Sequence, residues 1–138
     1  MNDLDSRAFS ALFREAYEKC FGYLQKKSLS ETESKLFYSR IFDQTGLVVG
    51  WKSLKNYSSF IVDVPTGKPE NPSIATLDTL SRHVIDAPYS SETERKEKDS
   101  HYPYWYAFKE KFNRSLKKDA ASQKTGTSIG IFLATLFF

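Results

Sequence analysis

The sequence has few of the residues from which disulfides, metal sites and catalytic centres are usually built. One cysteine, Cys20, occurs among 138 residues, so no disulfide can form within the chain. The two histidines, His83 and His101, stand in unlike contexts, and no nucleophile, metal-ligand or phosphate-loop spacing accompanies them. We therefore predict no enzyme activity, no metal, no cofactor and no small-molecule substrate.

A secretory signal and a long apolar run are also missing. The amino terminus, Met1 to Asp5, is acidic, which indicates a cytoplasmic protein. The uncharged segment from Ile129 to Phe138 has 10 residues, whereas a spanning helix needs about 20. It is predicted to be either a buried or interfacial helix or the start of a truncated transmembrane helix that anchors the chain to the inner membrane. The second alternative is supported by the basic residues before the segment, Arg114, Lys117, Lys118 and Lys124.

The excess of charge is small as well. The net charge of +3, from 20 basic and 17 acidic residues, does not identify a polyanionic partner. Aromatic residues are plentiful, with 11 Phe, 8 Tyr and 2 Trp, and such a content of bulky apolar side chains excludes wholesale disorder. The length suits one domain with its own core, which we expect to occupy residues 1–118.

Apolar residues recur at helical spacing in five stretches, which predicts an all-α domain of about five helices. In the first, Asp5–Lys26, Cys20 lies on the apolar stripe and is interpreted as a small buried hydrophobe. A capping box at Ser30–Glu33 begins the second helix, and Gly46 ends it. The other expected helices are Trp51–Val62, a helix capped by Ser73 that runs to Val84, and Trp105–Leu116.

Loops are predicted between these stretches. Asp63–Glu70 contains two prolines and a glycine, and Ser90–Ser100 has no apolar residue, so the latter is expected to be a solvated, mobile loop. A polar linker over residues 119–128 would lead into the apolar tail, 129–138. On the fourth helix we expect an outer face made of Asp78, Arg82 and His83.

The aromatic cluster around Trp105 allows two interpretations. Bases of single-stranded nucleic acid could stack on such a cluster. Trp105, Phe108, Phe112 and Leu116 nevertheless follow the helical period. That spacing favours closure of the core against the first and fourth helices.

The second and third helices, joined by the turn Gly46–Gly50, occur in the order that a helix-turn-helix DNA reader requires. The outer face of Trp51–Val62 carries two lysines and no acid. Lys52 and Lys55 could neutralise phosphates, and Asn56 could pair with adenine. The predicted DNA-binding residues are Trp51, Lys52, Ser53, Lys55, Asn56 and Ser59.

Three segments, Leu29–Gly46, Lys52–Lys55 and Asn71–Leu80, resemble the Cro-like phage-repressor helix-turn-helix domain. The likeness is greatest to a variant found in Bacteroidetes bacteria, in which a proline-serine cap precedes a threonine-leucine-aspartate helix. The most specific match is Pro72-Ser73-x-x-Thr76-Leu77-Asp78-x-Leu80, and Trp105 and Phe108 stand where the variant has a tryptophan-phenylalanine pair. This resemblance implies binding of duplex DNA and, by analogy, a homodimer on a near-palindromic site.

Two functions are therefore expected from the sequence. The first is a bacterial, cytoplasmic DNA-binding module in transcriptional regulation that reads duplex DNA with the helix from Trp51 to Val62. The alternative is a cytoplasmic protein-interaction module tethered to the inner membrane through its C-terminal apolar segment, because a fold alone does not fix a function.

Overall fold

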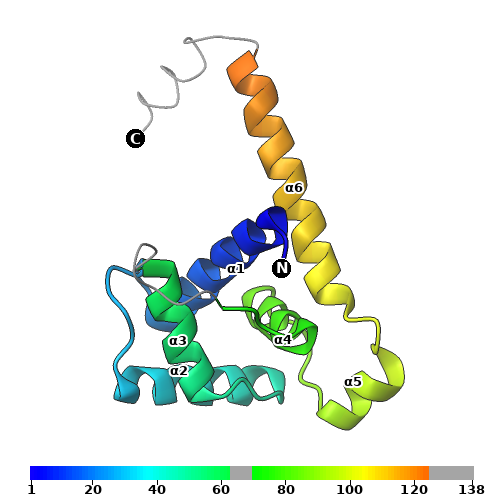
Figure 1. Cartoon of the computed structure of the whole chain (residues 1–138). Helices are drawn as coiled ribbons and strands as arrows, with labels where there is room; N and C mark the ends of the chain where they lie inside the picture. The colour runs from blue at the N-terminus through cyan, green and yellow to red at the C-terminus, as the bar shows by residue number, and fades with distance from the viewer. Residues whose placement is uncertain (63–69, 125–138) are drawn as a thin grey trace.

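The computed structural model describes residues 1–62 and 70–124, and this part of the chain is all-α, as predicted (Figure 1). It contains six helices and no strand. They are α1 (Asp3–Phe21), α2 (Glu31–Thr45), α3 (Trp51–Val62), α4 (Ile74–Val84), α5 (Glu92–Lys98) and α6 (Pro103–Lys124).

The first helix ends earlier than predicted. Asn2 caps its start by accepting a hydrogen bond from the Asp5 amide at 2.7 Å. Gly22, with φ +83°, ends it in the left-handed conformation, so Tyr23 and Leu24 lie beyond the helix and are exposed. Cys20 is buried as expected, and burial raises the pKa of its thiol although Arg40 lies beside it.

The predicted boundaries of α2, α3 and α4 are confirmed to within a residue or two. The Ser30 hydroxyl accepts from the Glu33 amide at 3.1 Å, and the Glu33 carboxylate accepts from the Ser30 amide at 3.0 Å, which completes the capping box. Gly46 ends α2 with φ +77°. Ser73 caps α4 by accepting from the Thr76 amide at 3.1 Å.

The core forms around α1, which contacts α2, α3, α4 and α6. Its Phe9 and Phe13 rings meet Tyr57 of α3 edge to face, with centroids 5.3 Å and 6.3 Å apart, and Phe13 meets Phe37 of α2 at 5.8 Å. Trp105 of α6 is buried against α1 and α4, which confirms that the aromatic cluster closes the core.

The segment Ser90–Ser100 is not the mobile loop that its composition predicts. Glu92–Lys98 forms α5, and Ser91 caps it by accepting from the Glu94 amide at 3.1 Å. The prediction was wrong because a long charged side chain can also be buried when it is paired. Arg95 is only 3% exposed and reaches Asp78 of α4.

The predicted outer face of α4 is also wrong. Asp78, Arg82 and His83 are 0%, 2% and 3% exposed. The reason is that α4 is covered on several sides, by α1 and α2 as well as by α6. Its polar side chains therefore find partners or an apolar environment inside the protein rather than water.

At its carboxyl end, α6 continues to Lys124, whereas the predicted helix ended at Leu116. The predicted apolar tail, 129–138, and most of the predicted loop after α3 lie outside the described residues. No helix within residues 1–62 and 70–124 combines the length and the apolarity that a membrane span requires.

Candidate nucleic-acid interface

The turn between α2 and α3 is held by buried groups. Leu47 and Val49 are buried, and the Thr45 hydroxyl accepts from the Leu47 amide at 3.1 Å while it donates to the Ile41 carbonyl at 2.7 Å. From outside the turn, the Ser90 amide donates to the Thr45 carbonyl at 2.9 Å. These contacts fix the direction in which α3 leaves α2.

The inner face of α3 is anchored as the sequence predicts, by buried Leu54, Tyr57 and Ile61. Ser58 adds a polar anchor, because its hydroxyl accepts from the Leu29 amide at 2.8 Å and donates to the Lys55 carbonyl at 2.8 Å. The opposite face of α3 is therefore presented in one orientation.

The predicted DNA-binding residues divide into two groups. Lys52, Lys55 and Asn56 are exposed on the outer face of α3, while Trp51, Ser53 and Ser59 are half-buried. Ser53 interacts with the buried Tyr57 hydroxyl, and the Ser59 hydroxyl donates to the Lys55 carbonyl at 3.3 Å. The two serines thus already have partners within the protein, whereas Lys52, Lys55 and Asn56 face solvent.

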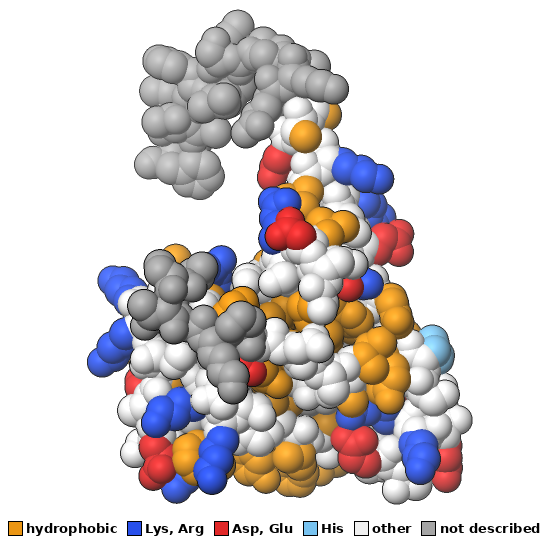
Figure 2. Space-filling model, viewed as in Figure 1, with side chains coloured by type: hydrophobic (Ala, Val, Ile, Leu, Met, Phe, Trp, Pro, Cys, Tyr) orange, Lys and Arg blue, Asp and Glu red, His pale blue; other side chains and the backbone are white. Residues whose placement is uncertain are grey.

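A lysine of α2 joins this surface. The Nζ atom of Lys35 lies 5.0 Å from the centroid of the Trp51 ring, and that of Lys52 lies 5.7 Å from it. Lys35 also pairs with Glu31 at 3.5 Å. Figure 2 shows Lys and Arg side chains spread over the side of the molecule where α2 and α3 lie. We call Lys35, Lys52 and Lys55 the α2–α3 lysines. Sequence reasoning missed Lys35 because only the fold brings it to Trp51.

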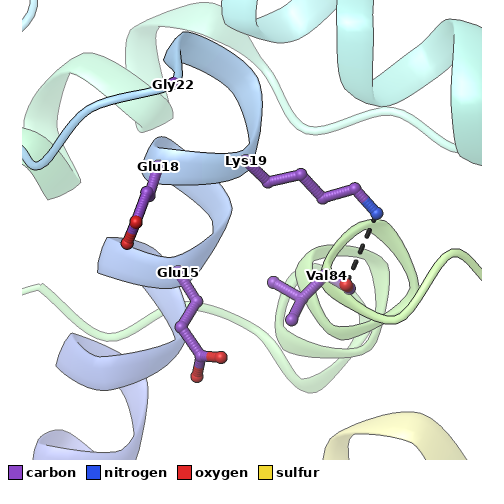
Figure 3. Close-up of a pocket in the computed structure, with 5 residues that line it drawn as sticks. All are labelled: Glu15, Glu18, Lys19, Gly22 and Val84. Carbon is purple, nitrogen blue, oxygen red and sulfur yellow. Dashed lines mark hydrogen bonds between the residues drawn. The ribbon is translucent and has the colours of Figure 1, made fainter.

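A second feature is an open hollow of about 400 Å³ between α1 and the end of α4 (Figure 3). The Nζ atom of Lys19 donates to the carbonyls of His83 at 2.6 Å and Val84 at 3.4 Å, so this cation caps the carboxyl end of α4. Burial raises the pKa of Glu15 at its edge. The lysine therefore has a structural role that accounts for its position.

The third feature is a buried charge network, which we call the Asp78 cluster. Its members are Asp78, Arg82, Glu92, Arg95 and Asp99. One carboxylate oxygen of Asp78 accepts from Arg82 at 2.8 Å and from Arg95 at 3.2 Å, and the other accepts from the Tyr104 amide at 3.2 Å.

The rim of the Asp78 cluster completes the pairing of both arginines. Asp99 lies 3.1 Å from Arg82, and Glu92 lies 2.6 Å from Arg95. Burial alone would lower the pKa of Arg82, but Asp78 and Asp99 more than offset it, so that pKa is raised. The cluster joins α4, α5 and the start of α6. The i, i+4 spacing of Asp78 and Arg82 and the i, i+3 spacing of Glu92 and Arg95 were the local signals for it.

His83 is buried without a well-aligned hydrogen-bond partner for either ring nitrogen among the described residues. Its pKa is lowered to about 4, chiefly by burial and also by the nearby Lys19, while the Ala16 backbone and Asp86 act in the opposite direction. Its ring lies 6.1 Å from that of Phe37. The neutral imidazole is part of the core.

Comparison of the chain with protein-family models, with curated proteins and with solved structures found no match. In the described part of the chain, no group of three or more His, Cys, Asp or Glu residues could hold a metal ion. Among the three features, the surface formed by α3 and the α2–α3 lysines is the one whose exposed groups are suited to an external partner.

Proposed function

We propose that the chain is a DNA-binding module of the Cro-like helix-turn-helix type, acting in transcriptional regulation, with α3 as its reading helix. The observation that carries the proposal is the outer face of α3. Lys52, Lys55 and Asn56 are exposed there, and α3 contains no acidic residue. The resemblance of the sequence to phage-repressor domains supports the same function.

In this proposal the exposed lysines and Asn56 have different roles in DNA recognition. The α2–α3 lysines neutralise phosphates, which provides most of the affinity. The Asn56 amide can donate to and accept from the edge of an adenine, which provides sequence discrimination. Because buried contacts fix the turn and the inner face of α3, these groups meet DNA already oriented.

A salt titration with duplex DNA tests the proposal. Each phosphate contact contributes about tenfold in affinity near 0.1 M salt and about one unit of slope in a plot of log affinity against log salt. We expect Lys52→Gln with Lys55→Gln to weaken binding by roughly 50- to 100-fold and to reduce the slope by about two. Fluorescence anisotropy with the full chain measures both quantities.

Lys96→Gln with Lys98→Gln is the matched control, since it removes the same charge from exposed positions of α5. This variant should bind DNA almost as the unchanged chain does. If the α3 variant binds normally, or if the control loses as much affinity as the α3 variant, then α3 is not the DNA-reading helix.

A further inference from the structure

The second half of α6 leaves the body of the protein. Trp105 and Phe108 of its first half are buried, but no residue from Lys109 to Ala121 is. Figure 1 shows the helix continuing well past α1, with its far end distant from α3. We call the segment Lys111–Lys124 the C-terminal arm. Phe112 at its start packs against the core, but no later hydrophobic residue up to Ala121 does, so most of this helix is formed without the packing that usually stabilises helices in proteins.

The C-terminal arm is strongly basic. It contains one acidic residue, Asp119, against five basic ones, Lys111, Arg114, Lys117, Lys118 and Lys124. Lys111, Arg114 and Lys118, at spacings of three and four, share one side of the helix. These three side chains are exposed and have no ion-pair partner within 4.0 Å among the described residues.

The other side of the arm carries apolar groups. Phe112, Leu116 and Ala120 recur every four residues; Phe112 packs against the core, whereas Leu116 is half-exposed and Ala120 is exposed. A helix with a basic side and an apolar side has the composition of helices that lie in the interface of an anionic membrane. A second copy of the arm is a poor partner, because two strongly positive helices repel each other.

Two polyanions could meet such a helix, a nucleic acid and an anionic lipid surface. The observations favour the lipid. The arm extends away from α3 (Figure 1), and the sequence that follows it, Ile129–Phe138, is uncharged and largely apolar. Basic residues beside an apolar segment provide the two signals, electrostatic and hydrophobic, that stable membrane anchoring requires.

We propose that the C-terminal arm docks on an anionic phospholipid surface. Lys111, Arg114 and Lys118 contact the headgroups, and Leu116 and Ala120 face the acyl boundary. This contact is separate from the DNA-binding surface on α3, so it adds a second partner to the proposed function.

Vesicle binding by the full chain tests this proposal. We expect the chain to bind vesicles of phosphatidylserine and phosphatidylcholine, and to bind vesicles of phosphatidylcholine alone far more weakly. The fourfold variant Lys111→Gln, Arg114→Gln, Lys117→Gln and Lys118→Gln should lose affinity for the anionic vesicles on the order of 100-fold or more. All four side chains are exposed, so circular dichroism should show an unchanged helix content.

The matched control has Lys52, Lys55, Lys96 and Lys98 changed to Gln, which gives the same net charge. It should keep binding the anionic vesicles. Equal loss in both variants would mean that net charge alone acts, and equal binding to both kinds of vesicle would mean that the apolar tail alone acts. Loss of DNA binding rather than vesicle binding in the arm variant would make the arm a nucleic-acid surface. Each of these three results would overturn the proposal.

Discussion

Gly46 and Gly22 have the same backbone conformation at the ends of two helices but different surroundings. Their φ angles are +77° and +83°, in the left-handed region that favours glycine. A Cβ atom at Gly22 would meet nothing within 4 Å, whereas one at Gly46 would lie 1.8 Å from the Ser90 carbonyl oxygen. The segment before α5 is therefore packed directly on the backbone of the turn.

Substitution of the two glycines distinguishes the free-energy cost of a left-handed backbone from the cost of a steric clash with Ser90. Gly22→Ala should lower the free energy of unfolding by about 1 kcal/mol, the cost of a left-handed alanine. Gly46→Ala should lower it by about 3 kcal/mol or more, because the Ser90 backbone must move and its hydrogen bond to Thr45 is strained. Urea unfolding at one pH measures both values, and equal losses would show that the contact with Ser90 is easily relieved.

At His83, burial makes stability depend on pH. The pKa of about 4 in the folded protein lies below the ordinary value of 6.5, so the neutral ring stabilises the fold. That contribution is fully present above pH 6.5 and is lost as the pH falls toward 4. It amounts to about 3 kcal/mol at most.

Unfolding free energies measured from pH 7 to pH 4 would show this loss. His83→Leu, which cannot titrate, should flatten the curve over that range. His101 is exposed, so His101→Leu should leave the pH dependence in place. If the His83 variant keeps the full dependence, other groups are responsible for it.

At the scale of the element, α5 consists of charged residues and one threonine, and it has no apolar side chain to bury. Its docking rests on Arg95, which contacts the Ala75 carbonyl at 3.0 Å and the Thr79 hydroxyl at 2.8 Å as well as Asp78. The seven-residue helix is too short to be stable alone. Its structure is therefore a consequence of one buried guanidinium and of the Ser91 cap.

Arg95→Met should consequently release α5. We expect a loss of about 3 kcal/mol in unfolding free energy, near the lower end for breaking a buried ion pair, because Arg82 still pairs with Asp78. Hydrogen exchange should show the α5 amides losing protection while those of α4 keep it. Lys96→Met, at an exposed position of the same helix, should change neither measurement, and retained protection of α5 in the Arg95 variant would contradict this role.

At the scale of the whole molecule, the sequence predicted the helices that carry local signals. Ser30, Gly46 and Ser73 mark helix ends through contacts within three or four residues, so they can be recognised without the fold. The interior of the Asp78 cluster could not be predicted, because Asp78 and Arg95 are buried by the packing of α4, α5 and α6 together. From the sequence alone such charged residues are expected to be exposed, whereas in the structure they are buried.

The candidate site divides in the same way. The exposure of Lys52, Lys55 and Asn56 follows from the helical period of α3 and was predicted correctly. The approach of Lys35 to Trp51 depends on how α3 packs against α2, and the inward role of Ser53 depends on the buried Tyr57. A single helix can be predicted from its own residues, but a surface formed by two helices can be predicted only when the way the helices pack is known.

The central position of α1 has a consequence for synthesis of the protein. This helix is made before α4 and before Trp105 of α6, on both of which it packs. At about 5 to 20 residues per second, the ribosome needs roughly 4 to 17 seconds to proceed from α1 to Trp105. During that time Phe9 and Phe13 are not yet fully buried. The nascent chain therefore exposes the apolar face of this helix to chaperones, and this face is buried in the folded protein.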